Sequence, residues 1–236
     1  KNSVSTLVVT HVIYRKNAPF DKLEGPYNSV ENSCQKLFGG TDVCQIPIGD
    51  FNDPVTYGPK SNPRALKVAR FWGRFLPLKY LLDSLIVLML TIGFISRNRG
   101  REKYIIAIDP LSCLPLVMLR FLLGSKLIYY CVDFNLHRFE NKMLQWIYEK
   151  ADEVSTRYSN QAWVVCESLR DYKLKKFQVR SIYIPNSTSF DPTLFNKNKK
   201  YKTGDKIAWT GTLLSDRQFD ILFRVLSEIQ QVKKDC

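Results

Sequence analysis

Short runs of apolar, often β-branched residues alternate with longer stretches of helical periodicity along most of this chain. This alternation restricts the available folds more than any other feature of the sequence. The run at 6–14 shows no polar alternation, which is typical of a strand covered by helices on both faces. Strands that alternate with helices predict an α/β fold built on a Rossmann-like, doubly wound parallel sheet.

The expected elements follow in regular order. Pro77 is expected to break or kink a long helix, and residues 50–63, dense in Pro, Gly, Asn and Asp, predict a loop. We expect strands at 6–14, 42–48, 104–109, 126–133, 162–166 and 181–184, and helices at 27–38, 64–96, 111–123, 138–160 and 168–177.

The composition changes after Pro185. Residues 186–205 are polar and rich in Lys and Asn, as linkers are, and a single strand and amphipathic helix follow. One such unit cannot bury its own apolar face. We therefore expect an N-terminal domain at 1–185, a linker at 186–205 and the incomplete start of a second Rossmann-like domain at 206–236. Because no signal peptide precedes Lys1 and the chain stops inside that second domain, we expect a fragment.

The net charge of the chain indicates which kind of partner it binds. Lys and Arg number 35 and Asp and Glu 22, a net charge of +13, which favours an anionic partner. The basic charge comes without a nucleic-acid-binding motif, so we do not expect nucleic acid to be bound. The six cysteines form no C-x-x-C pair, which favours free thiols in a reducing cytoplasm. Both histidines lie apart from paired cysteines, so no metal site is expected.

The segment Arg64–Lys103 combines basic and apolar residues. Its uncharged part, Ser84–Ile95, has 12 residues, whereas a bilayer-spanning helix needs about 20. A core helix is the first interpretation, and an interfacial anchor and a true span are the alternatives. In each case the flanking cations favour contact with an anionic membrane surface.

Polar residues at the carboxyl ends of the expected strands are the candidates for a site, because parallel sheets bind ligands there. Asp109 is expected to cap the helix that follows it. Asp133 and His137 suit either sugar binding with acid–base chemistry or a solvated turn. Gly25 precedes a helix start that suits either a phosphate or an ordinary turn. The further candidates are His11, Asn135, Glu167, Ser168 and Asn186.

Several segments resemble the retaining glycosyltransferases of family four. The similarity covers about the last third of the chain, and the first half matches only in its alternation of elements. The segment at 180–187 contains the Ile-Pro-Asn sequence found between the two domains of that family, and 207–211 followed by 220–222 resembles the opening of their second domain. The other matching segments are 151–155, 163–168 and 190–195.

The resemblance implies a GT-B architecture, with two Rossmann-like domains, an acceptor site in the first and a nucleotide-sugar site in the second. Asp133 and His137 then correspond to acceptor-side catalytic residues, and Gly25 to the family's glycine-rich loop. Arg217 stands at the family's phosphate-binding Lys, whereas Thr212 and Gln218 depart from its pattern. The family usually needs no metal or other cofactor, because basic groups stabilise the leaving diphosphate.

We therefore expect a glycosyltransferase that moves a hexosyl group, with retention, from a nucleotide-diphosphate sugar to a glycan or lipid-linked acceptor in polysaccharide or glycolipid synthesis. It would lie in the cytoplasm, peripheral on the inner face of the membrane, and the fragment alone would be inactive. The alternative is a non-catalytic membrane-docking subunit that recruits a donor-binding partner.

Overall fold

The structure of the chain is a computed structural model that describes residues 4–12, 14–15, 18–22, 26–48, 53–68, 76–135 and 138–185. The chain divides into two units, Lys1–Phe190 and Asp191–Cys236, and every described residue belongs to the first. The expected linker at 186–205 and the second-domain start at 206–236 lie outside the described residues. The domain boundaries therefore stay predictions.

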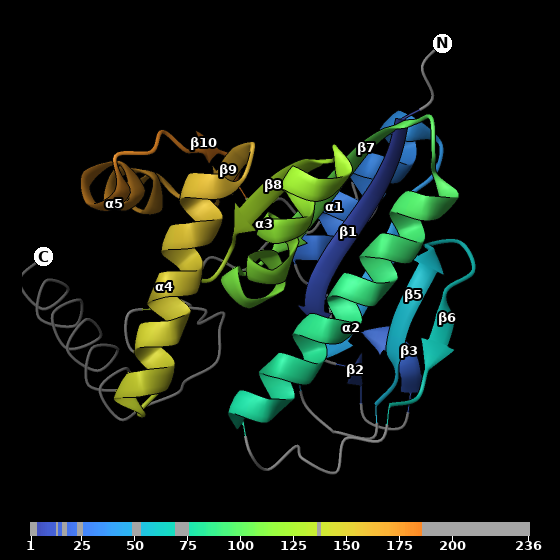
Figure 1. Cartoon of the computed structure of the whole chain (residues 1–236), viewed down its shortest axis with the longest axis horizontal. Coiled ribbons are helices and arrows are strands. Elements are labelled where there is room, and N and C mark those ends of the chain that lie inside the picture. The colour runs from blue at the N-terminus through green and yellow to red at the C-terminus, as the bar shows by residue number, and fades with distance from the viewer. Residues whose placement is uncertain are drawn as a thin grey trace, which may run out of the picture. The chain divides into compact units, whose positions relative to one another are not determined.

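An eight-stranded sheet in the order β10-β9-β8-β7-β1-β4-β5-β6 forms the centre of the first unit (Figure 1). The six strands from β10 to β4 are parallel, and β5 and β6 are antiparallel. A mostly parallel α/β sheet is thus confirmed. The strands of the sheet are β1 Val4–Val12, β4 Asp42–Pro47, β5 Val55–Pro59, β6 Arg64–Leu66, β7 Glu102–Ile108, β8 Lys126–Cys131, β9 Gln161–Val164 and β10 Ile182–Tyr183, and β2 Tyr14–Arg15 and β3 Ala18–Lys22 form a separate pair.

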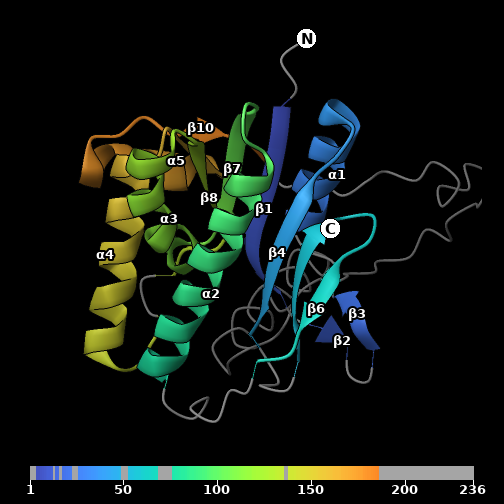
Figure 2. The same cartoon turned by 45° about the vertical axis from the view of Figure 1, so that its right-hand side comes forward.

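Helices cover both faces of the sheet (Figure 2). Leu7 and Val9 of β1 belong to a core with α2 and α3, whereas Val8 belongs to a second core with α1. Alternate residues of the parallel strands are buried in the two cores. Both sets are therefore apolar, which explains the continuous apolar runs in the sequence. The helices are α1 Pro26–Phe38, α2 Leu76–Arg97, α3 Pro110–Leu123, α4 Lys142–Tyr158 and α5 Glu167–Phe177.

Two predictions near the β5–β6 edge are wrong. The expected loop at 50–63 contains β5, and the expected helix start at 64–66 is β6. Gly58 and Pro59 suggested a loop, but Val55 and Thr56 are buried within the sheet. The Thr56 hydroxyl donates to Gln45 of β4 at 2.9 Å, which fixes the hairpin against the sheet. Tertiary packing here overrides the local turn signals.

Local capping signals set the helix ends. α1 ends at Phe38, as expected, and Gly39 follows with a φ of 73° that glycine adopts without strain. α2 begins one residue before Pro77, which fits the first turn of a helix. α4 begins at Lys142, later than the expected 138, because Asn141 caps its first backbone N–H groups.

A buried ion pair joins α5 to α4. Lys173 Nζ lies 2.6 Å from Asp152 Oδ1 and donates to the Thr156 hydroxyl at 2.9 Å. Both ionic side chains are fully buried, and Tyr129 donates its phenolic proton to the same carboxylate oxygen at 2.6 Å. The Lys173 ammonium also lies 5.7 Å from the centre of the Phe134 ring. This network fixes the loop after β8, where Asp133 lies.

The five described cysteines are free thiols, as the sequence predicts. Burial raises the pKa of Cys44, Cys113 and Cys131 to about 12 and that of Cys34 to about 11. These four thiols are therefore protonated at neutral pH and unreactive in the folded chain. Cys236 lies outside the described residues.

Candidate functional site

The strand order places a candidate site beyond the carboxyl ends of β1 and β7. The chain crosses from β1 to β4 on one side of β1, and β7 followed by β8 lies on the other side. Ligands of open α/β sheets bind at such a reversal of strand order. His11 lies near the end of β1, and Asp109 directly follows β7.

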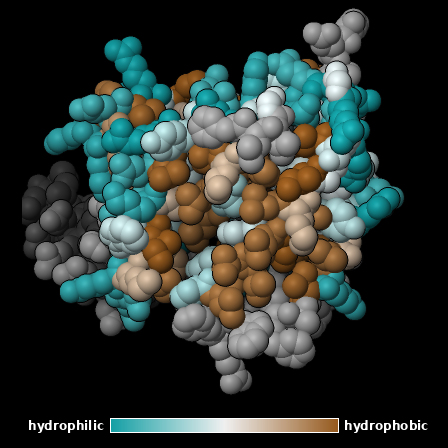
Figure 3. All heavy atoms as spheres, viewed as in Figure 1, coloured by the Kyte–Doolittle hydropathy of each residue, from teal (hydrophilic) through white to brown (hydrophobic). Residues whose placement is uncertain are grey.

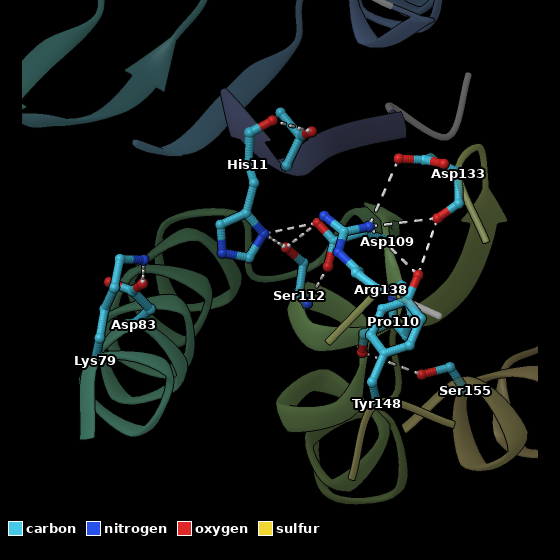
Figure 4. Close-up of polar contacts among 11 residues, drawn as sticks. His11, Lys79, Asp83, Asp109, Pro110, Ser112, Asp133, Arg138, Tyr148 and Ser155 are labelled. Carbon is cyan, nitrogen blue, oxygen red and sulfur yellow. Dashed lines mark hydrogen bonds and ion pairs between the residues drawn. The ribbon is translucent and has the colours of Figure 1, made fainter. Parts of the chain in front are cut away.

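His11 and Asp109 form a hydrogen-bonded pair at this point (Figure 4). His11 Nδ1 lies 2.7 Å from Asp109 Oδ2, and the Ser112 hydroxyl donates to the same carboxylate oxygen at 2.9 Å. The other oxygen, Oδ1, accepts the backbone N–H of Ser112 at 2.8 Å and caps α3. The expected cap is confirmed, and the same carboxylate also holds the imidazole.

The backbone at Asp109 is strained. Its φ of 87° lies in a region that side-chain-bearing residues rarely adopt. Such a conformation costs about 1–3 kcal/mol and persists where the surroundings impose it, most often at functional sites. Here it lets one carboxylate contact both the first turn of α3 and His11.

The surroundings of the Asp109 carboxyl favour its ionised form. Although burial alone would raise the pKa of the Asp109 carboxyl, the charge of His11 and the hydrogen bonds from His11 and Ser112 hold that pKa below its usual range. Because an ionised carboxylate only accepts hydrogen bonds, His11 Nδ1 must carry a hydrogen. In the neutral imidazole, Nε2 therefore has a free lone pair.

His11 Nε2 is the unusual atom of the site. It is buried and has no hydrogen-bond partner among the residues that the structure describes. Figure 4 shows it turned away from Asp109, on the side of the helix that carries Lys79 and Asp83. A buried polar atom without a partner costs about 1–3 kcal/mol, so its position indicates a ligand or a water molecule in the functional state.

A pocket of about 100 Å³ adjoins the pair. That volume is enough for a few water molecules or for a reacting group of a ligand. Arg138 Nη1 in its wall lies 3.4 Å from the Tyr148 hydroxyl and 3.6 Å from Asp133 Oδ2, long contacts that leave the guanidinium able to turn to a ligand. The pocket is lined by His11, Ile48, Lys79, Tyr80, Asp109, Leu111, Arg138 and Tyr148.

Lys79 in the lining of the pocket belongs to a buried ion pair. Lys79 Nζ lies 2.6 Å from Asp83 Oδ2 one turn further along α2, and both side chains are almost fully buried. The positive end of the α3 dipole lies at Pro110, beside Asp109. The Asp109 carboxylate already caps this helix end, so Arg138, with its long contacts, is the cation of the lining that is best placed to turn to a ligand.

Of the four predicted site residues, Asp133, His137, Gly25 and Arg217, the structure describes only Asp133. Asp133 is described, but its side chain is 81% exposed at the rim, and its backbone carbonyl accepts the Tyr148 hydroxyl at 2.9 Å. His137, Gly25 and Arg217 lie outside the described residues, as does Asn186. The proposed roles of Asp133 and of these residues stay predictions. Glu167 and Ser168 lie in the first turn of α5.

Sequence reasoning gave His11 and Asp109 only as separate strand ends and did not pair them. The available signal was that each lies at or near the carboxyl end of an apolar run expected to be a parallel strand. Among the residues that the structure describes, no three His, Cys, Asp or Glu side chains are grouped to hold a metal ion.

In comparisons with known proteins, no family model matches the chain, and no curated protein is significantly similar to it.

Proposed function

We propose that this chain forms the acceptor-binding lobe of a GT-B glycosyltransferase, which transfers a hexosyl group from a nucleotide-diphosphate sugar to a glycan or lipid-linked acceptor. The observation that carries the proposal is the His11–Asp109 pair, whose Nε2 atom has no partner among the described residues and lies beside a pocket at the reversal of strand order. The doubly wound sheet and the residues similar to family four support it.

The site suits the activation of a hydroxyl group. His11 Nε2 would accept the proton of an acceptor hydroxyl while that oxygen bonds to the anomeric carbon of the donor sugar, on the same face from which the diphosphate leaves, so that the configuration is retained. The bond from this carbon to the diphosphate oxygen breaks, and its electron pair leaves with the diphosphate. Asp109 stabilises the imidazolium that forms, because its carboxylate accepts the Nδ1 hydrogen at 2.7 Å.

The second domain would hold the donor, with Arg217 near the diphosphate, as the resemblance implies. We place the enzyme at the cytoplasmic face of a membrane, where polysaccharide and glycolipid precursors are assembled. No resident cofactor is part of the proposal, because cationic groups can stabilise the leaving diphosphate.

A transfer assay with the full-length protein tests this function. Labelled nucleotide sugars are incubated with a membrane extract that contains lipid-linked glycans, and the labelled product is measured. His11→Gln should lower the rate about 100-fold or more, because it removes the base. Asp109→Asn should lower it similarly, because an amide no longer fixes the Nδ1 hydrogen. Product NMR then tests the retention that the resemblance implies.

Asp171→Asn is the matched control, since its carboxylate is exposed on α5. It should leave the rate within about twofold of the wild type, because exposed groups contribute little. A His11→Gln protein that is folded and as active as this control would refute the role of His11. Transfer absent with every nucleotide sugar would refute the function itself.

The docking subunit remains a second candidate because α2 has an apolar outward face. This candidate predicts membrane binding without any transfer, and with no effect of His11→Gln on complex formation. The same assay therefore separates the two functions.

A further inference from the structure

The outward face of α2 is apolar. Exposed side chains occur at positions 81, 85, 89 and 92, a helical spacing that forms one stripe, and each is between 45% and 63% exposed. Lys79 and Asp83 are the only charged residues from 77 to 96, and they are buried against each other. A helix on the surface of a protein normally presents charged residues to water. The stripe consists of Leu81, Leu85, Met89 and Ile92.

The neighbouring helices extend this surface. Figure 3 shows hydrophobic atoms gathered over α2 and α3, with hydrophilic atoms above and to the left of them. Met118 of α3 is 70% exposed, and Met143 and Trp146 of α4 are also exposed. We call the α2 stripe together with Met118 the apolar face. Trp146 belongs to a residue type that prefers the membrane–water boundary.

The packing of α2 against the sheet shows whether this helix can span a membrane or only lie on its surface. By length and composition, Pro77–Arg97 could cross a bilayer, and it is the one such helix among the described residues. However, Val87 and Phe94 on its inner side are buried in the core that contains β1 and β4. A spanning α2 would leave the sheet uncovered. The helix therefore contacts a membrane only along its length, with the outer stripe inserted.

The charged residues near the end of α2 indicate which kind of surface the apolar stripe contacts. Arg99 and Arg101 follow α2 and are exposed, whereas Arg97 in its last turn is exposed but pairs with Asp42 at 3.1 Å. The one acidic residue of α2, Asp83, is buried against Lys79. The whole chain carries a net charge of +13. Each cation near an anionic leaflet contributes about 1 kcal/mol of binding. An apolar stripe followed by cations complements acidic lipid headgroups above acyl chains.

We propose that the apolar face docks in the interface of an anionic membrane, with α2 parallel to the bilayer plane. This surface is narrower than the expected membrane-contact segment Arg64–Lys103, because it is formed by the outward side of α2 together with Met118. The proposal does not depend on glycosyl transfer, because it concerns binding to lipid alone.

Vesicle sedimentation of the chain tests the proposal. Vesicles of phosphatidylcholine alone are compared with vesicles that contain about 30% phosphatidylglycerol. The wild type should bind the anionic vesicles at least about tenfold more tightly, and high salt should weaken that binding. The double variant Leu85→Glu/Met89→Glu should lose about tenfold or more of the affinity, because its carboxylates would enter the interface.

Leu37→Glu is the matched control. Leu37 is 76% exposed on α1, which packs on the other face of the sheet, so this variant should bind like the wild type. Circular dichroism verifies that all three proteins are folded. Release from membranes by alkaline carbonate should be complete, as for a helix that does not span.

Three results would overturn the proposal. The double variant and Leu37→Glu could bind equally well, or the wild type could prefer neutral vesicles. The wild type could also fail to bind vesicles while forming a dimer that the double variant does not form. The apolar face would then be an interface between two copies of the chain.

Discussion

The buried ion pair between α5 and α4 provides the sharpest stability prediction. Lys173 and Asp152 are both fully buried, and their charged atoms lie 2.6 Å apart. The substitution Lys173→Met keeps the length and volume of the side chain but removes its charge. The Asp152 carboxylate would then stay buried with Tyr129 as a hydrogen-bond donor and no cation beside it.

Removing one partner of a buried pair costs about 3–5 kcal/mol. Because methionine fills the space of the lysine stem, the substitution leaves no cavity that would lower the unfolding free energy further. Domains of this kind unfold with about 5–15 kcal/mol, so Lys173→Met should remove a large part of the stability. Urea unfolding followed by circular dichroism measures this loss as a lower midpoint at an unchanged slope.

Two further variants of the chain serve as controls for Lys173→Met. The double variant Lys173→Met/Asp152→Leu should recover to within about 2 kcal/mol of the wild type, because no buried charge remains. Lys175→Met, at an exposed position of the same helix, should change stability by less than about 0.5 kcal/mol. A cost below about 1 kcal/mol for Lys173→Met would refute the reasoning, because that is the value of an exposed pair.

Four other predictions concern the pH, a helix end, the thiols and the donor site. Because the folded pKa of Asp109 is lowered, its stabilisation is present above the unfolded pKa and is lost as the pH falls from about 5 toward 2, and Asp109→Asn should remove this part of the acid dependence of unfolding. Gln178→Gly should raise the unfolding free energy by about 1 kcal/mol in urea titrations, because Gln178 ends α5 with a φ of 58°. Iodoacetamide at pH about 8 should label Cys166 well before the four buried thiols, as mass spectrometry would show. Arg217→Ala should weaken calorimetric binding of nucleotide sugars to the full-length protein by about tenfold, and equal binding would refute its assignment.

Much of the fold could be predicted from local patterns. The apolar runs of β1, β7 and β8 have both faces buried, so burial is visible in the sequence itself. The α3 cap could be predicted because Asp109 and its donor Ser112 are three residues apart. The β5–β6 hairpin could not, because Gly58 and Pro59 look like loop residues until Thr56 contacts Gln45 of another strand.

The candidate site depends on distant parts of the chain. His11 and Asp109 are 98 residues apart, and they meet only because β7 enters the sheet beside β1. The sequence shows that each lies at or near the end of a strand but does not show the order of the strands. It favoured Asp133 and His137, which lie near each other in the chain. Nearness in sequence is a weak guide where the ends of parallel strands build the site.

The borders of the described sheet affect how copies of the chain can associate. β6 has three residues and begins with the exposed Arg64, and β10 at the opposite border has two. A long, flat border with free N–H and C=O groups would template strand addition between molecules, and short or charged borders suppress it. The short borders of the eight-stranded sheet therefore disfavour strand addition between folded copies of the chain at β6 and β10.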